Sequence, residues 1–321
     1  MTAPGKDVLA LSGGVGGAKL ALGLADTLQP GQLHVLVNTG DDFSHLGLHI
    51  SPDIDTLVYT LSGRANAAMG WGLEGETWQA LSALEELGGD TWFKLGDRDL
   101  ATHLWRTAQI ARGESLSKFT AAMARHLDVH SHVHPMTDDS VRTIVSTDQG
   151  DLPFQHYFVR ERCEPAVRGF SFDGISAATP NREVMQLLQQ SAFAHIVICP
   201  SNPFVSIDPV LQLPGMAQAL REAQAPVVVI SPIVGGMALK GPAAKMMTEL
   251  GMNVTALAVA RHYCDHYPGL IDYFVIDETD ATLASDIREL GVNVAVAPTV
   301  MKSRADKQEL ARFTLDLARA G

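Results

Sequence analysis

Short, continuous apolar runs recur along this 321-residue chain, and each run ends in a cluster of Gly, Asp, Ser, Asn or Pro. Strands that are apolar at every position are typical of a parallel sheet covered on both faces. Stretches with helical spacing lie between several of the runs, which indicates repeated βαβ units. We therefore expect an α/β fold with a Rossmann-like, doubly wound, mostly parallel sheet. The clearest runs are residues 8–11, 33–37, 196–199 and 227–230.

Two regions interrupt the alternation of strands and helices. Residues 56–140 are mostly helical in pattern, and we interpret them as a helical insertion, or cap, that covers the active edge of the sheet. Residues 141–172 contain three segments with the pattern of a small β-meander. The chain has no internal repeat and no long Gly/Ser/Pro linker. We therefore expect one α/β domain over residues 1–321.

The charge balance excludes some classes of partner. The chain has 24 Lys and Arg against 36 Asp and Glu, a net charge of -12. A nucleic-acid or anionic-membrane surface needs clustered cations, so we expect neither partner. The first residues pass directly into an apolar run without a signal-peptide pattern, and the three cysteines lie far apart, as reduced thiols do. We expect a cytoplasmic protein with small-molecule substrates.

A glycine-rich segment, SGGVGGAK at residues 12–19, follows the first apolar run and opens a helix. Glycines there let backbone amides approach a phosphate at the helix N-terminus. Lys19 stands where the dinucleotide-binding fingerprint has its third glycine, which argues against an NAD-dependent oxidoreductase. The alternative is a tight strand-to-helix turn without a ligand. The predicted phosphate-binding residues are Gly13, Gly14, Gly16, Gly17 and Lys19.

Acidic residues gather after the second apolar run, in NTGDD at residues 38–42 and SPDID at residues 51–55. Carboxylates placed in this way suit a Mg²⁺ ion that also binds substrate phosphates. They also suit solvated loops and helix caps, and the spacing alone does not separate the two interpretations. The candidate metal ligands are Asp41, Asp42 and Asp55.

Three further segments contain polar or charged residues that could contribute to a binding site. CPSNP at residues 199–203 and SPIVGG at residues 231–236 end two later runs and offer neutral hydrogen bonds to a nucleotide, and Lys240 follows them. KLGDRD at residues 94–99 mixes both charge signs, which is equally typical of a surface ion-pair cluster. Four histidines between residues 126 and 134 lack the partner set of a zinc site, and we interpret them as part of a loop.

Taken in order, these motifs resemble the 2-phospho-L-lactate transferase family of coenzyme F-420 biosynthesis. The resemblance extends from the first run to about residue 277, and nine motifs in one order make it specific. The motifs are SGGVGGAKL, VNTGDDFSHLGLHISPDIDTLVYTLSG, GWGLEGETW, KLGDRDLATH, PMTDDSVRT, EPAVRGFSFDG, CPSNPFVSIDPVLQLPGM, VVVISPIVGG and KGPAAKMM.

The resemblance implies a Mg²⁺-dependent transferase that is a homodimer. It would move 2-phospho-L-lactate, or a group derived from phosphoenolpyruvate or 3-phosphoglycerate, from a GMP-activated diphosphate donor to the deazariboflavin precursor FO, with release of GMP. A nucleotide-sugar-binding regulator of the same fold is the alternative. By position, the resemblance implies catalytic roles for Asp55, Asp41 and Lys94, FO binding by Asp55, Lys94 and Arg98, metal binding by Asp41, Asp42 and Asp55, and nucleotide contacts from the glycine-rich segment with Ser201, Asn202 and Pro203.

Overall fold

A seven-stranded sheet forms the centre of the protein in a computed structural model that describes residues 7–238 and 241–317. Every pair of neighbouring strands in this sheet is parallel, which confirms the predicted fold class. In spatial order the strands are β14 (Asn293–Val296), β13 (Tyr273–Ile276), β10 (Val227–Ile230), β9 (Phe193–Ile198), β1 (Asp7–Ser12), β2 (Leu33–Val37) and β5 (His132–Pro135).

The order of the strands contains one reversal. The chain builds outward from β1 through β2 to β5, returns to the other side of β1 with β9, and then continues through β10, β13 and β14. The reversal between β1 and β9 is the topological switch point of a doubly wound sheet. Connections diverge there, and doubly wound folds bind their ligands beyond the carboxyl ends of the strands at this point.

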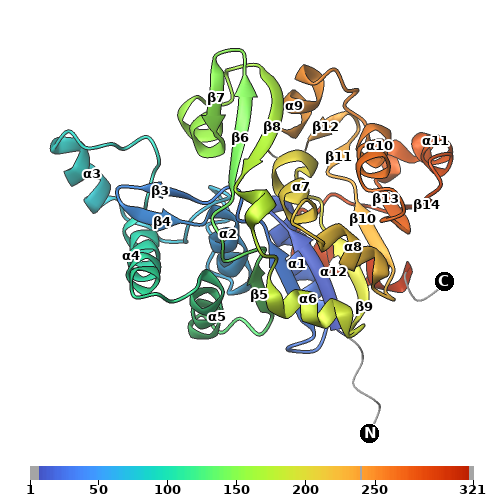
Figure 1. Cartoon of the computed structure of the whole chain (residues 1–321), viewed down its shortest axis with the longest axis horizontal. Coiled ribbons are helices and arrows are strands. Elements are labelled where there is room, and N and C mark those ends of the chain that lie inside the picture. The colour runs from blue at the N-terminus through green and yellow to red at the C-terminus, as the bar shows by residue number, and fades with distance from the viewer. Residues whose placement is uncertain (1–6, 239–240, 318–321) are drawn as a thin grey trace, which may run out of the picture.

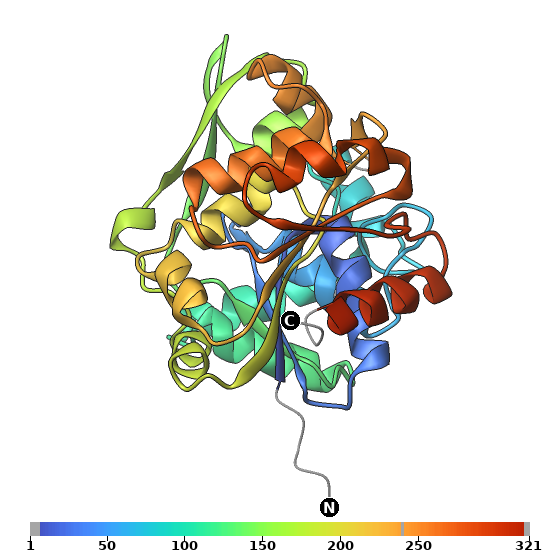
Figure 2. The same cartoon turned by 90° about the vertical axis from the view of Figure 1, so that its right-hand side faces the viewer.

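Helices cover both faces of the sheet because successive residues of each buried strand point to opposite sides. In β1, Leu9 and Leu11 enter one hydrophobic core, whereas Val8 and Ala10 enter the other. Figures 1 and 2 show α12, in dark red, beside α1, in blue. One face carries α1 (Gly14–Thr27), α2 (Pro52–Leu61), α5 (Leu116–His126) and α12 (Arg304–Leu317), and the other carries α6 (Arg182–Gln189), α8 (Met216–Glu222), α10 (Ala256–His266) and α11 (Ala284–Arg288).

Residues 56–140 divide between two parts of the structure. Helix α5 and strand β5 belong to the main sheet and its helical layer. The interpretation of the histidines as a loop is therefore wrong for His126, which ends α5, and for His132 and His134 in β5. Strand β5 is a short edge strand with few apolar residues, which hid it from the pattern. The hairpin β3 (Phe43–His45) and β4 (Leu48–Ile50) and the helices α3 (Gln79–Glu86) and α4 (Asp97–Ala111) form a peripheral unit, at the left of Figure 1.

The predicted β-meander is present as the antiparallel sheet β7-β6-β8, which stands above the main sheet in Figure 1. The prediction is wrong after Pro153, where His156–Arg160 forms a π-helical turn instead of a strand. This turn buries Tyr157 in the larger core, which a continuing exposed strand would not do. The bounds of the sheet and of the remaining labelled elements are β6 (Arg142–Thr147), β7 (Gly150–Pro153), β8 (Val167–Asp173), α7 (Asp208–Leu211), β11 (Ile233–Val234), β12 (Met237–Ala238) and α9 (Ala243–Glu249).

Among the described residues, no helix has the length and hydrophobicity that crossing a lipid bilayer requires.

A Gly23→Ala substitution should destabilise the protein. Gly23 lies where α1 packs on α12, and a Cβ atom there would stand 2.1 Å from the carbonyl oxygen of Lys307. Alanine favours the helix by about 1 kcal/mol, but moving a backbone neighbour costs more, so we expect a net loss of about 2 kcal/mol in urea unfolding. Gly169→Ala is the control, because a Cβ at Gly169 meets nothing within 4 Å. Equal stability of the two variants would contradict the prediction.

The buried rings of His34 and His134 should cost the protein stability as pH falls from 6.5 to 4, whereas Asp53, whose pKa burial raises to about 6, acts in the opposite direction. Burial, followed by the neighbouring histidines, lowers the pKa of His34 to about 4 and that of His134 to about 3. The unfolded imidazoles, with a pKa near 6.5, bind protons in this range while the buried rings do not, so acid favours unfolding. The rings face His132, Asp7 and Glu183.

We expect each ring to contribute a loss of up to about 3 kcal/mol between pH 7 and pH 4, measured as the difference between the urea-unfolding profiles of the unsubstituted protein and of a double variant. The double variant His34→Gln/His134→Gln should have a flatter profile, whereas a substitution of the exposed His130 by Gln should leave the profile unchanged. If the double variant has the slope of the unsubstituted protein, these two rings are not the source of the acid sensitivity.

Candidate functional site

The glycine-rich segment and the loop after β9 meet at the switch point of the sheet. Gly13, at the N-cap of α1, donates its backbone N–H to Ser201 Oγ at 3.1 Å, and that hydroxyl donates in turn to the Gly13 carbonyl at 2.7 Å. The Gly14 N–H donates to Asp53 Oδ1 at 2.8 Å. The structure therefore brings together two segments that are predicted to bind the nucleotide, although the amides of Gly13 and Gly14 already donate to protein groups.

The glycines allow α1 to approach this loop closely. A Cβ at Gly16 would stand 2.3 Å from the Pro200 carbonyl oxygen, and one at Gly17 would stand 2.5 Å from Ser201 Oγ. Any larger residue would push the N-terminus of α1 away from the loop. The tight-turn interpretation thus holds for the packing of these glycines, and phosphate binding at the helix N-terminus stays a prediction.

The other predicted nucleotide contacts are placed differently. Lys19 Nζ donates to the Met301 carbonyl at 3.3 Å, on the side of α1 that faces the start of α12. Asn202 Oδ1 accepts the Phe204 N–H at 3.0 Å and caps a π-helical turn, Pro203–Ile207. Such turns are rare and are frequent at functional sites. Lys240 lies outside the described residues.

Asp53 connects three parts of the site, and the sequence analysis gave it no role. Besides the Gly14 amide, its carboxylate accepts Asn38 Nδ2 at 3.0 Å, and the same amide group donates to the Val205 carbonyl at 3.2 Å. Burial raises the pKa of Asp53 to about 6, against the effect of the hydrogen bonds from Asn38 and Gly14. Its place in SPDID, in the first turn of α2 and two residues before Asp55, was a signal that could have identified it.

Asp41 and Asp42 lie beside Asp53. Burial, followed by the negative charge of Asp53, raises the pKa of Asp41 well above its usual range. Asp42 Oδ2 accepts the Ser51 hydroxyl at 2.7 Å and lies 3.1 Å from His49 Nε2. Three buried carboxylates so close together repel one another, and a bound cation would relieve that repulsion.

Asp55 faces α4 and not the glycine-rich segment. Its Oδ1 accepts a hydrogen bond from the guanidinium of Arg106, which is fully buried, and its Oδ2 lies 3.7 Å from His103 Nδ1. His103 Nε2 is 3.3 Å from Asp99 Oδ2, and Tyr59 donates its hydroxyl to Asp99 Oδ1 at 2.7 Å. Burial raises the pKa of Asp55, and the charge of Arg106 acts in the opposite direction.

The sequence analysis missed Asp99, His103 and Arg106 as parts of the site. Their spacing of four and three residues puts them on one face of α4, which was the available signal. Asp55, Asp99 and His103 offer ligand atoms within 4.8 Å of one another, close enough for a metal ion. The Arg106 guanidinium already binds Asp55, however, and a second cation there would be repelled.

Buried polar atoms without hydrogen-bond partners gather in this region. Among the described residues, eight buried side-chain atoms near Asp41 and Asp55 lack a hydrogen-bond partner. Folded proteins rarely leave such atoms unpaired, because each costs about 1–3 kcal/mol. The concentration at one place indicates a site for a polar ligand. The eight atoms belong to Thr39, Asp41, Asp42, His45, Asp55, His103, Arg106 and Thr143.

Lys94 and Arg98 lie on the peripheral unit, and both side chains are exposed. Lys94 follows Phe93 and precedes Leu95, which pack in the small core of that unit. The Arg98 guanidinium donates to the Glu74 carbonyl. Within the described residues neither makes a hydrogen bond or ion pair with Asp55, so their role toward an acceptor stays a prediction.

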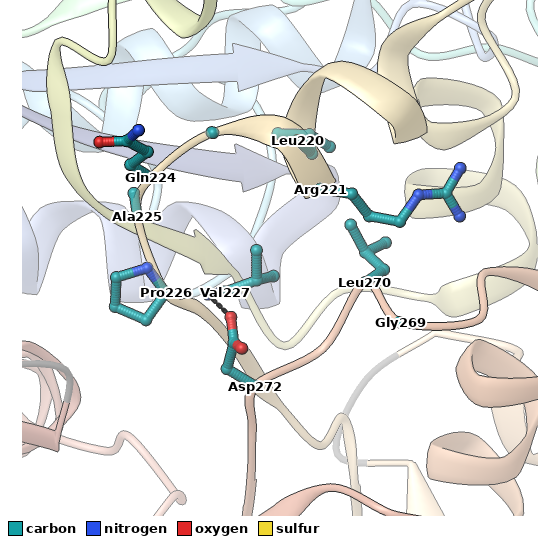
Figure 3. Close-up of a pocket in the computed structure, with 10 residues that line it drawn as sticks. Leu220, Arg221, Gln224, Ala225, Pro226, Val227, Gly269, Leu270 and Asp272 are labelled. Carbon is teal, nitrogen blue, oxygen red and sulfur yellow. Dashed lines mark hydrogen bonds between the residues drawn. The ribbon is translucent and has the colours of Figure 1, made fainter. Parts of the chain in front are cut away.

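A surface cavity of about 280 Å³ lies away from this region. It is lined by Arg221, Pro226, Leu270 and Asp272 among others, and the Val227 amide donates to Asp272 at its wall (Figure 3). These residues are at the amino end of β10, at the opposite edge of the sheet from the carboxyl ends of β1 and β9. The cavity therefore takes no part in the site.

Comparison with known proteins agrees with the resemblance seen in the motifs. The family model described as 2-phospho-L-lactate transferase CofD matches residues 8–311. A protein of Methanosarcina mazei called 2-phospho-L-lactate transferase is 36% identical over 96% of this chain and 99% of its own length. A protein of Streptomyces griseus called phosphoenolpyruvate transferase is 37% identical, over 97% of this chain and 98% of its own length.

Among solved structures, the fold is similar to that of a UPF0052 family protein from Bacillus halodurans. The TM-score is 0.65 with 16% sequence identity, over 98% of this chain and 100% of that one. At this identity the likeness supports the fold alone. The family match covers nearly the whole chain and includes every segment that forms the site, and the chain therefore belongs to the CofD family of 2-phospho-L-lactate transferases.

Proposed function

We propose that this protein transfers a phospho-acyl group from a GMP-activated diphosphate donor to a hydroxyl of FO, releasing GMP and forming the core of coenzyme F-420. The observation that carries the proposal is the group of unpartnered, buried carboxylate, hydroxyl and imidazole atoms around Asp41 and Asp55. Such a site is prepared for a charged ligand. Membership of the family selects a phosphorylated three-carbon acid as the class of group transferred.

Three acids are candidates for the transferred group. Relatives named for 2-phospho-L-lactate and for phosphoenolpyruvate are similar to this chain at 36% and 37% identity, so identity does not separate them. The third candidate is 3-phosphoglycerate. These acids differ by a few atoms, and discrimination between them depends on contacts with the donor.

The residues at the site fit a Mg²⁺ ion. Asp41 Oδ1, Asp42 Oδ1 and Asp55 Oδ2 are buried and have no hydrogen-bond partner among the described residues. Mg²⁺ prefers a few carboxylate oxygens and leaves its other positions to water and phosphate. When bound, it would neutralise charge on the diphosphate and on the departing GMP. Asp41 and Asp42 are the residues that would hold it. Asp55, the third ligand predicted from the sequence, instead lies with Asp99 and His103 and binds the Arg106 guanidinium.

The transfer breaks the bond between the phosphorus of the phospho-acid and the oxygen that joins it to GMP. A new bond forms between that phosphorus and the hydroxyl oxygen of FO, whose proton must leave. Asp55 accepts this proton in our proposal, because its pKa is raised by burial and a group titrating closer to neutrality is a better base. The bond from Arg106 fixes the carboxylate in place for this step.

The remaining residues bind and orient the two substrates. The N-terminus of α1 and the loop with Ser201 would face the nucleotide and its phosphates, where the helix dipole favours negative charge. Lys94 and Arg98 would offset negative charge on the acceptor side. The chain is proposed to act in the cytoplasm as a homodimer.

A mass-spectrometric assay tests the reaction. The purified protein is mixed with FO, Mg²⁺, GTP, the three candidate phospho-acids and a guanylyltransferase that activates them. We expect a product heavier than FO by one of the three groups, together with GMP, and the added mass identifies the acid. Absence of product combined with tight binding of a UDP-sugar would support the regulatory alternative and refute the proposal.

An Asp55→Asn substitution should reduce turnover by about 10²–10⁴, because it removes the proposed proton acceptor. Thermal melting and circular dichroism establish that the variant is folded, since the substitution also leaves Arg106 without its charge partner. Asp26→Asn is the control, because the Asp26–Arg304 ion pair at 2.6 Å joins α1 to α12 away from the site. Unchanged turnover of a folded Asp55→Asn variant would remove the base role.

A further inference from the structure

The β-meander contacts the NTGDD loop through its strand β6. The Thr143 backbone N–H donates to the Gly40 carbonyl at 2.7 Å. The Thr143 hydroxyl lies on the same side, since a Cβ at Gly40 would be 2.6 Å from Thr143 Oγ1. Glycine is required at position 40 for this approach. The contact places a hydroxyl from the meander directly beside the carboxylates of the candidate metal site.

The Thr143 hydroxyl faces Asp41. Burial and the charge of Asp53 raise the pKa of Asp41, while the Asn38 amide and the Thr143 hydroxyl lower it. Thr143 is 1% exposed and Asp41 is 5% exposed. Neither Thr143 Oγ1 nor Asp41 Oδ1 has a hydrogen-bond partner among the described residues.

Two unpaired oxygens that face each other in a buried site indicate a ligand shared between them. The Thr143 hydroxyl is close enough to the Asp41 carboxyl to lower its pKa, but Thr143 Oγ1 and Asp41 Oδ1 form no well-aligned hydrogen bond among the described residues, so both oxygens are available to a ligand. Oxygens of this kind are ligands that Mg²⁺ and Mn²⁺ prefer, and threonine hydroxyls bind Mg²⁺ in other phosphate-transfer sites.

We propose that Thr143 Oγ1 is a further ligand of the divalent cation, which it binds together with Asp41 Oδ1. The inference rests on the proposed function, because that function supplies the cation site. This ligand would add strand β6 of the meander to the candidate metal site. The cation would thus join the NTGDD loop to β6, and Thr143, the last residue of the PMTDDSVRT motif, would give the meander a role in binding.

The experiment measures binding of Mn²⁺ to the full-length protein, without FO or donor, by isothermal titration and by the electron paramagnetic resonance signal of free Mn²⁺. Thr143→Val removes the hydroxyl and keeps the shape of the side chain, while Thr143→Ser keeps a hydroxyl. Thr120→Val is the matched control, because the Thr120 hydroxyl on α5 is also buried and unpartnered but lies outside the carboxylate cluster. Thermal melting of each variant with and without MgCl₂ reports folding and cation binding together.

We expect Thr143→Val to weaken Mn²⁺ binding by at least about tenfold and to reduce the rise in melting temperature that MgCl₂ causes. Thr143→Ser should restore most of the affinity, and Thr120→Val should bind as the unsubstituted protein does. Equal Mn²⁺ affinity of Thr143→Val and the unsubstituted protein would overturn the inference, as would an unsubstituted protein that binds no Mn²⁺.

The two proposals fail separately. If the unsubstituted protein forms the FO product while Thr143→Val keeps full Mn²⁺ affinity, the transferase function stands and the role of Thr143 does not. If Thr143→Val loses Mn²⁺ binding but no product forms with any of the three acids, the cation ligand stands and the proposed reaction does not.

Discussion

The burial of four aspartate carboxylates at one edge of the sheet is the constraint on which the site depends. Asp41, Asp42, Asp53 and Asp55 are each at most 7% exposed. Unpaired charges are costly to bury, so each carboxylate must be neutralised, hydrogen-bonded or bound to a cation. The Asp53 carboxylate accepts hydrogen bonds from the Gly14 and Asn38 amides, and Asp55 accepts one from Arg106. The negative charge that lacks such compensation is therefore that of Asp41 and Asp42. This electrostatic arrangement is the physical basis for proposing a cation at Asp41 and Asp42.

The fold was predictable from the sequence because burial on both faces leaves a pattern in single strands. The runs that became β1, β2, β9 and β10 are apolar except for His34, and a parallel sheet is the structure that covers them. Strand β5 was not predictable in this way. His132 and His134 make it polar, and its pairing with β2 is formed between residues about a hundred positions apart.

The candidate site was predictable in part, for a related reason. Motifs at strand ends indicated Asp41, Asp42 and Ser201, since the carboxyl ends of parallel strands meet at one edge. The partners that fix those groups come from elements packed on the sheet, such as Arg106 on α4 and Thr143 on β6. The spacing of residues within a helix or a meander does not indicate which loop that element will contact. Tertiary packing alone brings these residues to the edge.

The first turn of α2 directs the two aspartates of the SPDID motif toward different neighbours. Residues two apart on a helix point about 200° apart, so Asp53 and Asp55 face different neighbours. Asp53 bonds to Gly14 at the start of α1, on the side of the proposed nucleotide, whereas Asp55 bonds to Arg106 on α4, on the side of the peripheral unit. A rigid helical turn between the two carboxylates fixes their separation. In the proposed transfer between two bound substrates, that separation would set how closely acceptor and donor can approach, so the geometry of α2 would position the reaction as directly as the side chains that touch the substrates.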